Sequence, residues 1–174
     1  MRYIFVFVAA MLAGCVNQPQ SFAPNVQRRP ALDGQVPKLP NPVVDMMDPD
    51  SESAIVKDIQ RGGSGPWRWT GKNPEVRIFV VRTDGQNLKV RYAIAESTFR
   101  ETGPVTLTFL VNGKPLGTVL EGAAGQKEFV NPIPPGMLVA NTDNLFSIEI
   151  DKVFVSKLDG AQLGMILASV ELTH

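Results

Sequence analysis

Residues 105–120 read VTLTFLVNGKPLGTVL. In the first half of this stretch, apolar residues recur at every second position, which is typical of a half-buried β-strand. Asn112-Gly113 follows at once, and this dipeptide is the strongest short signal for a tight hairpin turn. Lys114 to Leu120 then supplies the returning strand. The stretch predicts an antiparallel hairpin with four side chains in a core: Val105, Leu107, Phe109 and Val111.

The same alternation recurs on both sides of this hairpin. Further runs that read as strands are 75–82, 126–130 and 163–172. In each of three strands, one set of alternate residues is expected to face the core. These sets are Leu88, Val90, Tyr92 and Ile94; Phe146, Ile148 and Ile150; and Ile166, Ala168, Val170 and Leu172. Glycine-containing turns separate the runs, and no long helix is evident. The sequence therefore predicts an all-β fold, an antiparallel jelly-roll-like β-sandwich of seven or eight strands.

Residues 50–60 have two readings. A short helix capped by Asp50 or Ser51 would place Ile55, Val56 and Ile59 on one face. A first strand from Ile55 to Ile59 fits the same residues. Both readings end before the glycine-rich break at residues 62–66.

The N-terminus has the pattern of an export signal. Met1-Arg2 is followed by an uncharged apolar run from Tyr3 to Leu12. Ten helical residues span about 15 Å, against about 30 Å of membrane hydrocarbon, so the run suits a signal peptide better than a permanent span. Leu12-Ala13-Gly14-Cys15 resembles the lipobox of bacterial lipoproteins. The resemblance implies removal of residues 1–14 and lipid on Cys15; the alternative is an ordinary secretory peptide.

A lipid on Cys15 would hold the chain at a membrane of the cell envelope, provided that at least two acyl chains are attached. Val16 follows the cysteine, whereas an Asp there resembles the inner-membrane retention signal. In a host with two membranes we therefore expect the outer membrane. Because Cys15 is the only cysteine, the exported domain has no disulfide and depends on its core.

Residues 15–50 are rich in proline and poor in apolar side chains. The prolines are Pro19, Pro24, Pro30, Pro37, Pro40, Pro42 and Pro49. Such a segment predicts an extended, semi-rigid tether, followed by a folded domain over residues 51–174. The alternative is that part of it docks on the domain or on a partner, because Val43-Val44 and Met46-Met47 are apolar.

Composition excludes several kinds of chemistry. Seventeen basic residues balance seventeen acidic ones, so no basic surplus favours nucleic acid as a partner. The only histidine, His174, is the last residue, which argues against a Ser-His-Asp arrangement and a His-rich zinc site. No carboxylates stand in a spacing that demands catalysis; those available are Glu96, Glu101, Asp84 and Asp151. We expect no enzyme and no cofactor.

Carboxylate and amide oxygens are the usual ligands of a structural Ca²⁺. Asn144, Asp151 and Asp159 offer such oxygens, but nothing in the sequence resembles a dedicated calcium loop. We therefore expect no metal site.

Two tryptophans are the most informative candidates for binding. Trp67 and Trp69 stand at i and i+2, so on a strand they point to the same face. Sugar rings pack on aromatic faces while polar side chains hold their hydroxyls. The alternative is that both indoles cap the core, or that one is buried and the other partly exposed. Arg100 and Glu101, after Thr98-Phe99, are a second candidate rim, with a solvated loop as the alternative.

Residues 68–172 resemble β-sandwich domains of the galactose-binding or carbohydrate-binding-module type. The likeness rests on four short motifs: Arg68-Trp69-Thr70, Val111-Asn112-Gly113, Leu163-Gly164 and Val170-Glu171-Leu172. It implies glycan binding without catalysis.

Two other classes of function compete with the glycan-binding one. A structural or assembly lipoprotein would bind another envelope protein, through an apolar patch near Met137 and Val139 and a docked tail. A small enzyme would show two facing carboxylates in a pocket.

Overall fold

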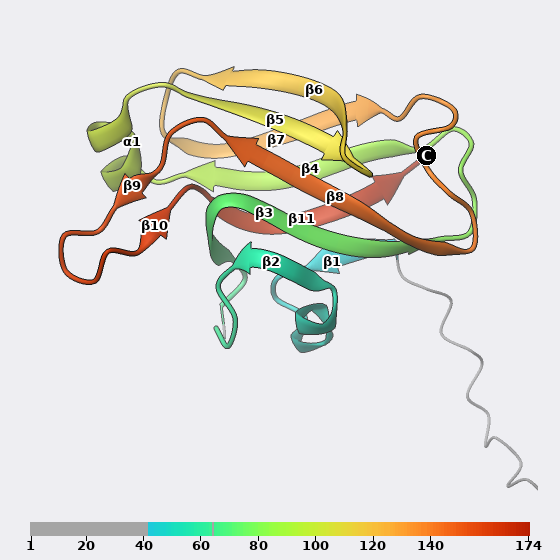
Figure 1. The fold of residues 1–174 in the computed structure, drawn as a ribbon, viewed down its shortest axis with the longest axis horizontal. Coiled ribbons are helices and arrows are strands. Elements are labelled where there is room, and N and C mark those ends of the chain that lie inside the picture. The colour runs from blue at the N-terminus through green and yellow to red at the C-terminus, as the bar shows by residue number, and fades with distance from the viewer. Residues whose placement is uncertain (1–41, 64) are drawn as a thin grey trace, which may run out of the picture. The chain divides into compact units, whose positions relative to one another are not determined.

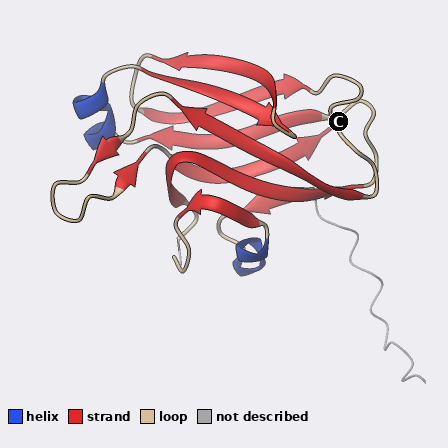
Figure 2. Cartoon of the chain, viewed as in Figure 1, coloured by secondary structure: helices blue, strands red, loops and turns tan. Residues whose placement is uncertain are grey.

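Eleven strands dominate the part of the chain that the computed structural model describes, residues 42–63 and 65–174 (Figures 1 and 2). They are β1 (Val43–Asp45), β2 (Ile55–Ile59), β3 (Arg68–Val80), β4 (Asn87–Ile94), β5 (Val105–Val111), β6 (Lys114–Glu121), β7 (Gly125–Pro132), β8 (Thr142–Ile150), β9 (Phe154–Val155), β10 (Gln162–Leu163) and β11 (Ile166–Thr173). Every pairing is antiparallel, which confirms the all-β sandwich. The predicted signal peptide, Cys15 and the tether up to residue 41 lie outside the described residues.

The long strand β3 joins the two layers of the sandwich. The hydrogen-bonded order is β6-β5-β8-β3-β11-β4-β7, with β1 beside β11 and β2 beside β3. Arg68 and Trp69, at the start of β3, pair with β11, whereas residues 75–80 pair with β8. We call β1, β11, β4 and β7 sheet A, and β2, β8, β5 and β6 sheet B. The start of β3 therefore extends sheet A, and its end extends sheet B.

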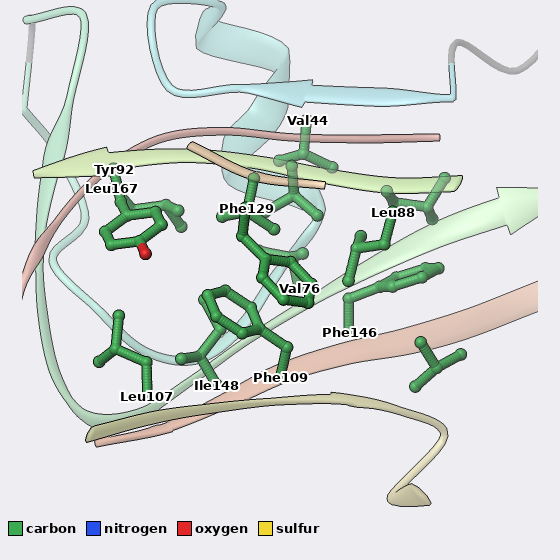
Figure 3. Packing of buried hydrophobic residues seen from close by; sticks show 14 of the residues in the cluster. Val44, Val76, Leu88, Tyr92, Leu107, Phe109, Phe129, Phe146, Ile148 and Leu167 are labelled. Carbon is green, nitrogen blue, oxygen red and sulfur yellow. The ribbon is translucent and has the colours of Figure 1, made fainter. Parts of the chain in front are cut away.

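Aromatic rings fill the centre between the sheets (Figure 3). Phe109 of β5 is fully buried and stacks on Phe129 of β7, with ring centroids 3.8 Å apart and planes 5° apart. Gly117 lies opposite Phe109 on β6, and a Cβ there would come within 3.0 Å of the Phe129 ring. The glycine thus leaves room for this ring. The faces predicted for residues 88–94, 105–111 and 146–150 are confirmed as core.

The face predicted for the last strand is wrong in its first half. Leu167 pairs with Tyr92 and Ser169 with Arg91, so Ala168 is an extra residue in β11. Such a bulge reverses which side chains face inward. Val170 and Leu172 are buried as predicted, but Ile166 and Ala168 lie on the outer face of sheet A.

The folded part begins before the predicted boundary at residue 51. β1 pairs with β11, and both Val44 and Met46 are buried in the core. For residues 43–46, the docked alternative therefore describes the structure.

Of the two readings of residues 50–60, the strand from Ile55 to Ile59 is confirmed as β2. The helical reading is wrong for these residues, because the helical turn here is a 3₁₀-helix, η1 (Pro49–Ser53), which ends before Ile55. It is capped by Asp48, whose side chain accepts the N–H of Asp50, and not by Asp50 or Ser51.

A short helix, α1 (Glu96–Thr102), occupies the segment expected to be a loop. Thr98 is buried on its inner side, and the helix ends at Gly103, whose positive φ of 65° suits a glycine after the last turn. No helix within residues 42–63 and 65–174 is long and apolar enough to cross a membrane.

The apolar connection 132–139 closes one end of the sandwich. Ile133 and Leu138 are buried, while Val139 stays exposed. The buried amide of Asn144 holds the loop, accepting the N–H of Val139 and donating to its carbonyl, each at 2.8 Å. Asn112 donates to Asn144 Oδ1, also at 2.8 Å. The hairpin turn thus supports the loop that seals the core.

A buried polar cluster ties sheet A to the end of β6. The Tyr92 hydroxyl donates to Glu121 Oε1 at 2.5 Å, and Lys127 lies 3.4 Å from the other oxygen of Glu121. Burial, reinforced by the hydrogen bond and by the negative charge of Glu121, raises the pKa of Tyr92 well above its usual range. The phenol therefore stays protonated in the folded chain under mildly alkaline conditions.

This shift predicts alkaline destabilisation. Below about pH 10 the phenol is neutral in both states, so its contribution to stability is fully present. Above about pH 10 the unfolded chain releases the proton while the folded chain retains it, so the free energy of unfolding falls as pH rises. Tyr3 is the only other tyrosine, so in a Tyr3→Phe protein tyrosinate absorbance reports Tyr92 alone. We expect that signal to appear together with the loss of circular dichroism. A reversible titration near pH 10 in the folded protein would contradict the shift.

Candidate functional site

The outer face of sheet A carries an open hollow of about 830 Å³, which we call the larger hollow. Its floor comes from outward side chains of β4, β7 and β11, including Arg91, Glu128 and Ile166. Ala168 belongs to this floor because of the bulge in β11. Ligand sites usually measure about 300–1,000 Å³. The full lining is Asp45, Met47, Pro66, Trp67, Arg91, Tyr92, Ala93, Gln126, Lys127, Glu128, Ile166 and Ala168.

Arg91 is fixed in this floor by two partners. Its Nη2 lies 2.7 Å from Glu171 Oε1, and its Nε donates to Ser169 Oγ at 2.9 Å. Ser169 in turn donates to Glu171 Oε1 at 2.8 Å. The bulge places Ser169 opposite Arg91, so the same irregularity that turns Ala168 outward also supports the guanidinium. A donor held in this way loses little side-chain freedom when a ligand arrives.

Trp67 forms one wall of the larger hollow and is 46% exposed. It packs edge-to-face on Trp69, with centroids 6.4 Å apart and planes 88° apart. Trp69 is half-buried, and Arg68 between them is buried on the other side of the strand. The expected shared face of the two indoles is therefore what the structure shows. Neither indole is fully buried as a core cap, but Trp69 is more buried than Trp67, which is close to the alternative of one buried and one partly exposed ring.

A second hollow, of about 490 Å³, lies beside Trp69; we call it the smaller hollow. It is bounded by the end of β2, the start of β3 and the β9–β10 hairpin. Its lining is polar apart from the indole and a few aliphatic groups: Asp58, Ile59, Gln60, Trp69, Thr70, Gly71, Ser156, Asp159, Ala161, Gln162 and Leu163.

Asp58 reaches the smaller hollow through an irregular strand. The register of β2 against β3 shifts on both sides of Lys57, and Asp58 has a left-handed φ of 58°. Its carboxylate lies over Gly71, where a Cβ would overlap it, and accepts the N–H of Asn73. A positive φ costs free energy for a residue with a side chain, although Asp tolerates it better than most.

Asp159 stands across the smaller hollow, in the β9–β10 turn. The Ser156 hydroxyl and then the N–H of Ala161 stabilise its charged form, which lowers the pKa of this carboxyl below its usual value. A general acid for glycoside hydrolysis needs a shift in the opposite direction. The carboxylate is therefore suited to accepting hydrogen bonds.

The other predicted residues lie elsewhere. Within the described chain, Arg100 and Glu101 line neither hollow; both are exposed on α1. Asn144 lies near the start of β8 and Asp151 directly follows its end, roughly 20 Å away along the strand, so they do not share one ion. No group of three or more metal-ligating side chains is gathered within residues 42–63 and 65–174.

Sequence reasoning missed most of the polar lining. The alternation of residues 88–94 predicts that Arg91 points outward. It does not predict that the pairing of β4 with β7 places Arg91 beside Gln126 and Glu128, or that the bulge in β11 supports it. Gln162 and Asp58 come from segments with no regular pattern. Of the residues that line the two hollows, the sequence singled out Trp67 and Trp69 for glycan binding and Asp159 only as an oxygen donor for Ca²⁺.

Comparison with known proteins gives structural likenesses alone. No protein-family model matches the chain, and no curated protein sequence matches it. A family 35 carbohydrate binding module from an environmental isolate aligns with a TM-score of 0.46 and 9% identity, over 76% of this chain and 92% of that one. CBM35 from Cellvibrio japonicus Abf62 gives 0.45 and 13%, over 76% and 91%. The CBM36-1 domain of a xylanase from the hindgut metagenome of Trinervitermes trinervoides gives 0.44 and 9%, over 76% and 95%. Values this low do not carry a ligand from those proteins to this chain.

Proposed function

We propose that this chain is a lipid-anchored envelope protein whose β-sandwich binds a glycan without catalysis, at the larger hollow. The observation that carries the proposal is the half-exposed ring of Trp67 beside the fixed guanidinium of Arg91. A pyranose needs both an apolar surface for its C–H face and oriented polar groups for its hydroxyls. The larger hollow provides the apolar surface in its Trp67 wall and the oriented polar groups in its floor.

The polar groups around Trp67 are arranged for hydrogen bonding. Gln126 and Glu128 project from β7 into the same hollow as Arg91. Lys89 pairs with Glu128 at 3.1 Å, so this carboxylate also has a defined position. The floor thus contains both donors and acceptors, which suits the hydroxyls of a sugar, since each of them both donates and accepts.

Trp67→Ala tests the proposal. We expect the protein to bind selected glycans on an array, and the variant to bind the strongest of them at least about tenfold more weakly, because an exposed tryptophan at the centre of a site supplies much of the binding energy. Calorimetry with that glycan gives the affinities. Phe79→Ala is the matched control, because it removes a ring that is 39% exposed and lines neither hollow of the described chain.

A silent array, or equal binding by Trp67→Ala, would overturn the glycan proposal. A clean protein partner captured from solubilised envelope, with the array silent, would instead favour an assembly lipoprotein.

The anchor rests on Leu12-Ala13-Gly14-Cys15, and we place the protein in the outer membrane of a host that has two membranes. Metabolic labelling with an alkyne analogue of palmitate tests the anchor directly. We expect label on the wild-type chain and its loss in Cys15→Ala, together with release of the protein from the membrane fraction. Unchanged membrane retention of Cys15→Ala would contradict lipid attachment at this residue, which is the only cysteine.

A further inference from the structure

The two hollows are neighbours on one face. Trp69 is the cross-strand partner of Ile166, and directly opposed side chains in an antiparallel pair lie on the same side of the sheet. Ile166 lines the larger hollow, whereas Trp69 lines the smaller one. The indole pair is therefore the shared wall between the two hollows.

That wall presents two aromatic surfaces at different angles. Trp67 is turned to the larger hollow and Trp69 to the smaller, with their planes 88° apart and their centroids only 6.4 Å apart. Successive sugars in a glycan chain are rotated about their linkage, so two adjoining units can meet two differently oriented rings.

The charges of the hollows differ. The larger hollow contains both signs, with Arg91 and Lys127 beside Glu128. The described lining of the smaller hollow contains the carboxylates of Asp58 and Asp159, the amides of Gln60 and Gln162, and neither Lys nor Arg. A uronate would meet like charge there, which disfavours it, whereas hydroxyl and amine groups find acceptors.

We propose that both hollows form one track that binds an extended glycan chain, and that the segment in the smaller hollow is a neutral or amine-bearing sugar. This inference rests on the proposed function and adds the length and the charge class of the ligand. The larger hollow binds one part of the chain against Trp67, and the chain then crosses the indole pair to the acceptors beside Trp69.

The test is a glycan array that carries neutral, amino-sugar and uronic-acid series, each from single sugars to long oligomers. We expect signal to rise with chain length and to be strongest in the neutral or amino-sugar series. Two matched variants separate the hollows, because Gln126 and Gln162 are both exposed glutamines, one in each hollow. Loss of one hydrogen bond predicts about three- to tenfold weaker binding of long oligomers by either variant. Arg100→Ala, on α1, is the neutral control.

The short ligands distinguish the outcomes. We expect Gln126→Ala to bind both single sugars and long oligomers more weakly than the wild type. Gln162→Ala should bind only the long oligomers more weakly. Preference for single sugars, preference for uronic acids, or wild-type binding of long oligomers by Gln162→Ala would overturn the track while leaving the Trp67 site intact. No signal with any series would overturn the proposed function itself.

Discussion

Replacing Phe109 with alanine is expected to lower the free energy of unfolding by about 3–5 kcal/mol. Phe109 is fully buried and stacks on Phe129, with the ring centroids 3.8 Å apart. The tilted ring of Tyr92 is its other aromatic neighbour, with a centroid distance of 5.9 Å. Removing it leaves a cavity between sheets A and B that neither layer can fill, because the strands on both sides are held by hydrogen-bonded partners. Domains of this size have about 5–15 kcal/mol of stability in total, so this loss is a large part of it.

Urea titration followed by circular dichroism measures this loss. Phe79→Ala is the control, because Phe79 is the same residue type but is 39% exposed on the outside of β3. We expect it to change the free energy of unfolding by less than about 1 kcal/mol. A loss of that small size in Phe109→Ala as well would mean that the two sheets do not meet at this ring pair.

Phe109 also illustrates what the sequence reveals. Alternation from Val105 to Val111 and the Asn112-Gly113 turn are local properties, so they predict the central hairpin and its buried face without knowledge of the fold. The prediction depends only on which face of a strand avoids water. It succeeds wherever a strand keeps a strict period of two.

Irregular backbone conformations could not be predicted from the sequence. The extra residue at Ala168 reverses the outward face of β11, and no residue type in Ile166 to Leu172 signals it. Asp58 enters the smaller hollow through a left-handed conformation that sequence patterns do not register. Both irregularities shape the candidate site, because one supports Arg91 and the other places a carboxylate beside Trp69. The tryptophans were predictable as candidates since their chemistry is local, whereas their polar neighbours are set by tertiary pairing.

Beside the smaller hollow, the link between β10 and β11 packs closely against β3. Gly164, between β10 and β11, passes directly over β3: its N–H donates to the Thr70 carbonyl at 2.8 Å. Thr70 and Met165 are joined by two more hydrogen bonds, one through the backbone and one through the Thr70 hydroxyl. A Cβ at position 164 would overlap the carbonyl oxygen of Gly71 and lie 2.6 Å from Ile150 Cδ1. The side chain of Ile150 can rotate away, but the backbone of β3 cannot.

Gly164→Ala is therefore expected to destabilise the fold by about 3 kcal/mol, at the upper end of the usual cost of overpacking. Gly122→Ala is the matched control, because a Cβ there meets nothing within 4 Å and we expect a change within about 0.5 kcal/mol. Urea titration of both variants gives the comparison. We expect the β9–β10 hairpin of Gly164→Ala to move away from Trp69 to relieve this clash, and such a movement widens the smaller hollow. A Gly164→Ala protein as stable as Gly122→Ala would show that the hairpin does not rest on β3, and the smaller hollow would then have no rigid wall on that side.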